Sequence, residues 1–141
     1  MEVSFFYVIF VIDKFKTKMI MTQEQKDLLL KDLCARLPYG VKFVIDNDQN
    51  NVRTLNGIRE DIPYEDWQMC AFARGISAIP IEDIKPYLFP LSSMTEEQKI
   101  ELTCIIDSDY AKIDWYNKNH FDYRGLIPKD LANDATGLNI Y

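Results

Sequence analysis

The chain has 141 residues and carries a net charge of -6, from 16 basic and 22 acidic side chains. Hydrophobic residues make up 48% of the sequence and charged residues 27%, which is typical of a folded domain and excludes a disordered, collagen-like or coiled-coil chain. Because phosphate backbones are bound by clustered lysines and arginines, the acidic balance predicts no direct binding to nucleic acid.

Residues 1–20 are predicted to be an apolar N-terminal extension of a single domain that covers residues 21–141. Residues 3–12 read VSFFYVIFVI, and three lysines follow. A membrane-spanning helix needs about 20 apolar residues, and a signal peptide carries its basic residues before the apolar run. Two interpretations remain open. The segment is a β-strand, paired in this chain's own sheet or with a second copy in a homodimer, or it lies upstream of a natural start at Met21.

The first predicted helix covers residues 22–37. Thr22 and Gln25 have the spacing of a capping box, and Pro38 and Gly40 end the helix. The apolar face is predicted to contain Leu29, Leu30, Leu33, Cys34 and Leu37, with Lys26, Asp27, Lys31 and Asp32 off that face.

Antiparallel strands are predicted in the middle of the chain, at residues 41–45, 52–58 and 67–73, with a short fourth strand that includes Ile76 and Ile79. Residues 46–51 read DNDQNN, which favours a hairpin turn. A calcium loop is excluded there, because Asn51 and Gly57 stand where it requires glycine and a bidentate glutamate.

Helices are predicted for the rest of the chain. Ile81, Ile84 and Leu88 indicate a helical turn that is interrupted near Pro86. A second capping box, read from Ser93 to Glu96, starts a helix near Ser93 or Thr95. We expect a break at residues 107–109, a further helix to about His120, and a last short helix within residues 126–132. The predicted fold class is α+β: a small antiparallel sheet of three to four strands with an N-terminal amphipathic helix and C-terminal helices.

The three cysteines are Cys34, Cys70 and Cys104. Their number is odd, their spacing is wide and no CxxC motif occurs, so a disulfide framework is not expected. We predict three free thiols, buried as small hydrophobic side chains in a cytoplasmic protein.

No metal or other cofactor is expected. Asp107, Asp109 and Asp114 are close in sequence, but metal-dependent hydrolysis needs carboxylates that converge. On a continuous helix Asp109 would point about 160° away from Asp107. A small metal-dependent hydrolase that uses these carboxylates and His120 remains the alternative function. The single histidine, His120, is expected instead to carry its charge at a helix C-terminus.

The aromatic segment near the C-terminus supplies the candidate interaction residues. They are Trp115, Tyr116, Phe121, Tyr123 and Arg124, residue types that dominate interface hot spots. Arg124 could also bind a carboxylate through a forked pair of hydrogen bonds. The alternative interpretation is that this turn only docks the last helix on the core. The expected function is that of a non-enzymatic protein-interaction module with a protein partner.

Three stretches together resemble a known family. They are residues 21–43 (MTQEQKDLLLKDLCARLPYGVKF), 81–98 (IEDIKPYLFPLSSMTEEQ) and 114–132 (DWYNKNHFDYRGLIPKDLA). This wording resembles small hypothetical proteins that are common in gut Bacteroidales genomes, often in phage or mobile-element contexts. The apolar segment before Met21 lies outside that family's pattern, and residues 56–78 are where its members vary. The family has no established activity, so the resemblance implies only a bacterial or phage cytoplasmic protein that begins near Met21.

Overall fold

The computed structural model describes residues 21–61, 68–105 and 108–141. The predicted N-terminal extension, Trp67 and Asp107 therefore lie outside the described residues. The helices are α2 (Gln23–Arg36), α3 (Glu96–Thr103) and α4 (Asp109–Lys118), with short 3-10 turns at Leu37–Tyr39, Ile81–Asp83 and Leu91–Ser93. The strands are β1 (Lys42–Ile45), β2 (Arg53–Asp61), β3 (Gln68–Ala73), β4 (Ile76–Pro80), β5 (Ile84–Pro90), β6 (Phe121–Asp122) and β7 (Asn133–Asp134).

The strands form one mixed sheet in the order β4-β3-β2-β1-β5-β6, and β7 also pairs with β5. Strands β1 to β4 and the β1–β5 pair are antiparallel, whereas β6 and β7 pair with β5 in parallel. The α+β class and the four strands of the middle region are confirmed. The sheet is larger than predicted, because β5, β6 and β7 add to the four strands of the middle region.

The predicted helical turn at Ile81, Ile84 and Leu88 is wrong beyond its first residues. Only Ile81–Asp83 forms a 3-10 turn, and the chain is extended from Ile84 to Pro90. Ile84, Pro86 and Leu88 are buried on one face of β5, and Tyr87 is buried on the other. A strand of this kind reads as a nearly continuous apolar run, which periodicity does not distinguish from a short helix.

Helix α2 begins as predicted. The Thr22 hydroxyl accepts a hydrogen bond from the Gln25 backbone at 3.2 Å, and the Gln25 side chain accepts one from the Thr22 backbone at 3.0 Å. The buried face differs from the prediction, because Asp32 is buried and Cys34 is exposed. The fully buried positions of α2 are Leu29, Asp32, Leu33 and Arg36. A charged pair therefore shares the face that the sequence assigned to leucines and cysteine.

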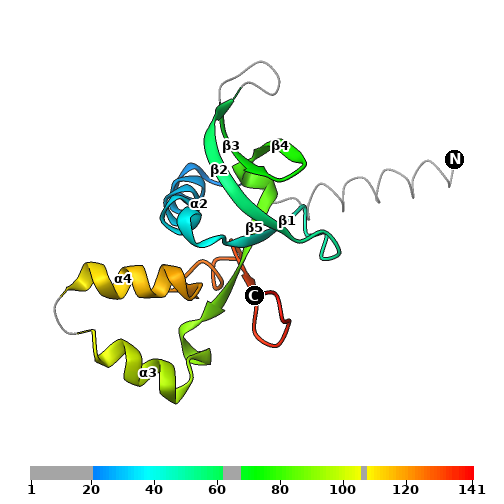
Figure 1. Ribbon diagram of the computed structural model, residues 1–141. Coiled ribbons are helices and arrows are strands. Elements are labelled where there is room, and N and C mark those ends of the chain that lie inside the picture. The colour runs from blue at the N-terminus through cyan, green and yellow to red at the C-terminus, as the bar shows by residue number, and fades with distance from the viewer. Residues whose placement is uncertain (1–20, 62–67, 106–107) are drawn as a thin grey trace, which may run out of the picture.

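The core lies where α2 covers one face of the sheet (Figure 1). Leu29 and Leu33 pack there in one cluster with buried residues from strands β1 to β5 and the C-terminal turns: Val41, Phe43, Leu55, Ala71, Ala73, Ile79, Leu88, Leu126 and Leu131. Cys70 is also buried, whereas Cys104 is exposed. None of the three cysteines forms a disulfide, but the expectation of burial is wrong for Cys34 and Cys104.

The C-terminal half differs from the prediction at two points. Helix α3 is capped by Thr95, one of the two predicted starts, but the capping partner of Thr95 is Gln98, so the box lies two residues later than the one read from Ser93 to Glu96. The predicted helix at 126–132 is wrong, because residues 126–130 form turns. The predicted break before α4 is confirmed, and Ser108 is the residue that caps this helix.

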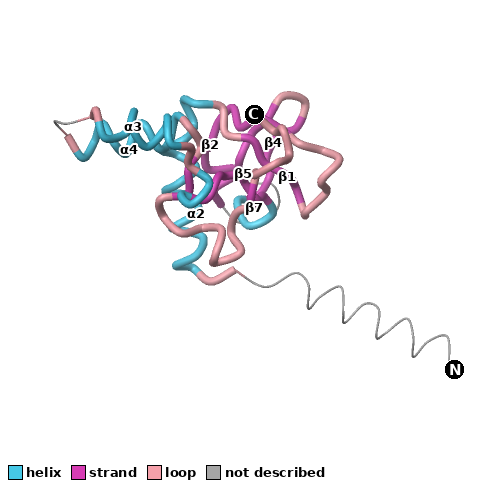
Figure 2. The backbone as a smooth tube through the Cα atoms, turned by 90° about the horizontal axis from the view of Figure 1, so that it is seen from below, coloured by secondary structure: helices cyan, strands magenta, loops and turns pink. Residues whose placement is uncertain are grey.

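Helices α3 and α4 project together from the body of the molecule (Figures 1 and 2). We call this pair, Glu96–Thr103 and Asp109–Lys118, the helical arm. Helix α3 buries no side chain, and α4 buries only Trp115 and Asn117. Among the helices of the described ranges, none combines the length and the apolar character needed to cross a bilayer.

Candidate interaction site

The five candidate interaction residues come together where the helical arm meets the body, and we call this cluster the arm root. Trp115 stacks on Phe121, with ring centroids 5.5 Å apart and planes inclined by 7°. Tyr116 stacks on Tyr123 at 5.5 Å and meets Trp115 edge to face at 5.8 Å. The Arg124 guanidinium carbon lies 4.9 Å from the centre of the Tyr123 ring. Residues of a helix, a strand and a turn thus form one continuous cluster.

Burial divides the arm root into two parts. Trp115 is 7% exposed and Phe121 is 1% exposed, so these rings pack the arm against the body. Their burial favours the interpretation that this segment docks on the core. Tyr116, Tyr123 and Arg124 are half-buried and keep surface that a partner can contact. Partner contact by these residues stays a prediction.

A buried ion pair lies beneath the arm root. Arg36 Nε approaches Asp32 Oδ2 at 2.7 Å and Nη2 approaches Oδ1 at 3.2 Å, with both side chains fully buried. Arg36 Nη2 also donates to the Phe121 carbonyl at 2.6 Å, which ties α2 to β6. The forked pair expected of Arg124 is therefore made by Arg36. Arg124 reaches Asp32 Oδ1 only through Nε, at 3.3 Å.

The turn after β6 is held by Asp122, which the sequence analysis did not single out. Its carboxylate accepts hydrogen bonds from the backbone N–H groups of Leu126 and Ile127, each at 2.8 Å. Gly125 lies between Asp122 and Leu126, with φ at +75°, a conformation that L side chains rarely adopt. Asp122 is itself buried. These contacts set the turn that replaces the predicted last helix.

His120 does not act as the expected charged helix cap, because Asn119 closes α4. The pKa of His120 is lowered to about 4, mainly by burial and next by the nearby positive charges of Arg36 and Lys42. The imidazole is therefore neutral at pH 7. Its ring stacks on Tyr141. The Tyr141 hydroxyl donates to the Tyr87 carbonyl at 2.8 Å and accepts from the Lys42 backbone at 2.9 Å, and burial raises the pKa of Tyr141 to about 12.

The carboxylates of the alternative function do not assemble into a site. Asp109 and Asp114 are exposed on α4, and Asp107 is outside the described ranges. Within residues 21–61, 68–105 and 108–141, no three histidine, cysteine, aspartate or glutamate side chains are placed to hold a metal ion. The geometry therefore gives the metal-dependent hydrolase no support.

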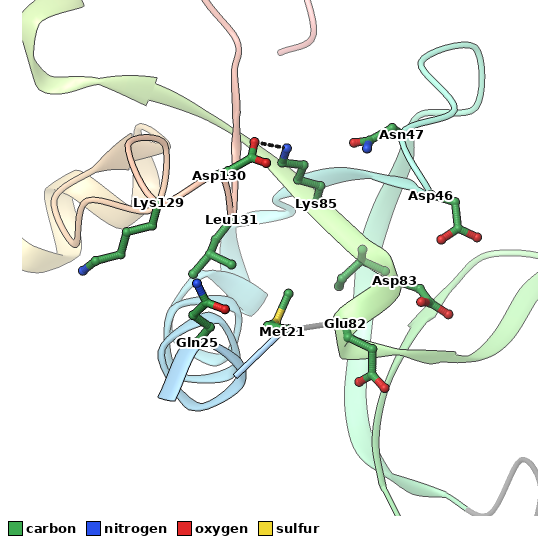
Figure 3. A pocket seen from close by; sticks show the side chains of 11 residues that line it. Met21, Gln25, Asp46, Asn47, Glu82, Asp83, Lys85, Lys129, Asp130 and Leu131 are labelled. Carbon is green, nitrogen blue, oxygen red and sulfur yellow. Dashed lines mark hydrogen bonds and ion pairs between the residues drawn. The ribbon is translucent and has the colours of Figure 1, made fainter. Parts of the chain in front are cut away.

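A small polar pocket lies between the end of β1, the start of β5 and the first turn of α2 (Figure 3). Its volume is about 140 Å³, below the roughly 300–1,000 Å³ of typical ligand pockets. Lys85 forms an ion pair with Asp130 on one side of it. The other lining residues are Met21, Gln25, Asp46, Asn47, Glu82, Asp83, Ile84, Lys129 and Leu131. This pocket is too small to indicate a substrate site.

Comparison of the chain with protein-family models, with curated proteins and with solved structures found no match. A functional interpretation therefore depends on the geometry of the chain itself.

Proposed function

We propose that this protein is a non-enzymatic protein-interaction module whose helical arm contacts the partner. The observation that carries the proposal is the exposure of three large apolar side chains on the arm: Ile100 (64% exposed), Tyr110 (83%) and Ile113 (38%). Tyr110 and Ile113 are three residues apart and so lie on one side of α4. We expect these exposed apolar side chains to supply the contact surface, since contiguous exposed apolar surface marks interaction sites.

The arm root supports this proposal because it holds the arm in a defined orientation. Trp115 stacks on Phe121 of the body, and its indole N–H donates to the Glu101 carboxylate on α3 at 3.1 Å. A surface that is held in place before binding loses less conformational entropy when the partner docks. Tyr116, Tyr123 and Arg124 would extend the contact surface from the arm toward the body.

We further propose a cytoplasmic location and an origin in a bacterial or phage mobile element. The resemblance of residues 21–132 to small Bacteroidales proteins supports this origin. The absence of a disulfide among the three described cysteines suits a reducing compartment. The partner is proposed to be a protein, because the net charge of -6 disfavours nucleic acid.

The test compares three full-length proteins in affinity capture from the native host with quantitative mass spectrometry. The arm variant carries Tyr110→Ser and Ile113→Ser. The matched control is Leu138→Ser, which changes an apolar side chain that is 52% exposed and lies outside the arm. Substitutions at such exposed positions change stability by about 0.5 kcal/mol or less, so all three proteins should unfold at similar temperatures.

We expect a partner that the wild type and Leu138→Ser recover equally and that the arm variant recovers at least tenfold less. A second copy of the chain would give the same pattern in size-exclusion chromatography, with the arm variant shifted to monomer. Equal recovery by all three proteins would contradict the proposal, as would recovery of no partner and no second copy.

A further inference from the structure

Strand β4 (Ile76–Pro80) is the outermost strand at one end of the sheet, and among the described strands only β3 pairs with it. The opposite end of the sheet is β6, which has only two residues. Edge strands that stay unpaired usually carry charged side chains, whereas the β4 sequence, ISAIP, contains none. A register shift in the β3–β4 ladder and Pro80 protect part of this edge. The remaining backbone groups on the outer side of β4 offer a place for one more strand.

Apolar side chains lie on both faces of the sheet next to this edge. Ile79 of β4 is 5% exposed and belongs to the core cluster together with Ala71 and Ala73 of β3. Phe72 stands between these alanines, is half-buried and lies outside the cluster, because successive side chains of a strand point to opposite faces. A strand added to β4 would therefore meet apolar side chains on both of its faces.

The described part of the chain begins close to this edge. Met21 lines a pocket together with Glu82, Asp83 and Ile84, which come shortly after the end of β4 (Figure 3). Residues 13–20 separate Met21 from the apolar run VSFFYVIFVI at residues 3–12. A stretch of eight residues reaches up to about 26 Å when extended, whereas a five-residue strand is only about 17 Å long. The apolar run is therefore long enough and near enough to lie along the whole of β4.

We propose that residues 3–12 add a strand to the outer edge of β4 within the same chain. Apart from Ser4, the run consists only of β-branched and aromatic residues, which favour strands. It is apolar in both alternating sets of positions, which is typical of a strand covered on both faces. A tether of this length gives an effective concentration of about 1 mM, which exceeds that of a second copy at micromolar protein concentration. The occupant of the edge is thus the chain's own segment.

Charge complementarity between the tether and the surface beside β4 supports the same placement. The tether contains three lysines, Lys14, Lys16 and Lys18. Asp46 and Glu82 are exposed where they line the pocket beside Met21, and Lys26 lies 3.9 Å from Glu82. Exposed ion pairs are individually weak, so these charges would guide the tether toward β4, and the backbone pairing would hold the strand.

The first test measures amide hydrogen exchange by NMR in three full-length proteins: wild type, Val8→Pro/Ile9→Pro and the matched control Val8→Thr/Ile9→Thr. Adjacent prolines remove a backbone donor on each side of the strand, whereas threonine keeps the donor and the β-branched shape. We expect the β4 amides that do not bond to β3 to exchange at least tenfold faster in the proline variant than in the wild type. The threonine variant should match the wild type. Amides of β1 and β5 should exchange equally in all three proteins, which checks that the fold is intact.

The second test needs no substitution and identifies the chain that supplies the strand. Nuclear Overhauser contacts between residues 3–12 and β4 are recorded on labelled wild type diluted tenfold into unlabelled protein, and isotope-filtered spectra of an equal mixture report contacts between copies. We expect contacts within one chain and none between copies. Contacts only between copies would overturn the chain's own segment as the occupant and show a dimer joined through β4. Absence of both kinds of contact, or unchanged β4 exchange in the proline variant, would overturn the inference.

Discussion

The imidazole of His120 lies flat against the phenol ring of Tyr141, with ring centroids 3.7 Å apart and planes inclined by 10°. Tyr141 in turn bridges the backbones of Lys42 on β1 and Tyr87 on β5, and Lys42 Nζ donates to the Ile140 carbonyl. The last residues of the sequence are thereby attached to the middle of the sheet. Because His120 follows α4 directly, the same contact joins them to the arm root.

Acidification is expected to destabilise the protein through His120. Its pKa is about 4 in the folded protein and near 6.5 in an unfolded chain, so the unfolded state takes up the proton first as pH falls. The stability that the folded protein gains from the neutral imidazole is fully present above pH 6.5 and is lost as the pH falls toward 4. We expect the unfolding temperature of the wild type to fall more steeply over this range than that of His120→Asn.

Asparagine is suitable at this position because it tolerates the left-handed backbone of His120, with φ at 62°, and does not titrate. Carboxylates titrate in both proteins, so their effect on the unfolding temperature cancels when the wild type is compared with His120→Asn. Parallel pH profiles for the two proteins would show that His120 is not responsible.

Removing only one member of the buried Asp32–Arg36 ion pair should lower the free energy of unfolding far more than removing both members. Arg36→Met leaves the Asp32 carboxylate buried with only the single contact of Arg124, so we expect a loss of about 3–5 kcal/mol. Among the described residues, none accepts a hydrogen bond from the buried Arg36 Nη1, and an apolar side chain there removes that cost as well. The double variant Asp32→Leu/Arg36→Met should recover most of the loss. Denaturant unfolding of Arg36→Met, Asp32→Leu and the double variant measures the difference, and additive losses of the two single variants would refute the expectation.

Asp122 should contribute strongly to stability through the turn it holds. Asp122→Ala removes two hydrogen bonds from a buried carboxylate, and each such bond to a charged group is worth about 1.5–3 kcal/mol. The matched control is Asp134→Ala, since Asp134 is exposed and accepts one bond from the Thr136 backbone. The Asp134→Ala variant should lose only about 0.5 kcal/mol of unfolding free energy. Chemical denaturation should separate the two variants clearly, and equal losses would contradict the role of Asp122.

Deletion of residues 1–20 is expected to leave a cooperatively folded domain. The residues from Met21 onward already assemble a core around Leu29, Leu33 and Phe43. Thermal unfolding and size-exclusion chromatography of the full-length and Met21-start proteins test this. A truncated protein that loses its unfolding transition would show that the segment belongs to the fold. A change only from dimer to monomer would show that the segment belongs to an interface.

The N-terminal half could be predicted because its signals are local. The Thr22 box, the break at Gly40 and the turn after β1 each depend on neighbours within a few residues, and Asp46 and Asn47 take the left-handed conformation expected of them, with φ at 50° and 60°. The burial of Asp32 and Arg36 depends instead on the Phe121 carbonyl and Arg124. An i, i+4 acid–base pair on a helix ordinarily indicates a solvated surface, so the sequence placed Asp32 off the buried face, although it assigned Leu29 and Leu33 to that face correctly.

The candidate interaction site was likewise predictable only where its signals are local in the sequence. The sequence identified the aromatic cluster but could not divide it into buried and accessible rings, because Trp115 stacks on Phe121, and Phe121 is placed by pairing with Phe89 of β5, far away in the sequence. Strand β5 was missed for a similar reason. Two of its three pairing partners, β6 and β7, come from much later in the chain. Local periodicity carries no information about such partners.

The position of β5 also sets an order of folding. Strands β1 to β4 pair across short connections, whereas Phe89 must find Phe121 and Tyr87 must find Asn133 through long loops whose closure costs more conformational entropy. Residues 121–141 should therefore join last and open first, through bridges of only two residue pairs each. This opening would release Trp115 from Phe121 and free the arm. A partner that holds the arm root would slow that opening, so its binding would appear as slower amide hydrogen exchange at Ala135, whose N–H bonds to the Leu88 carbonyl.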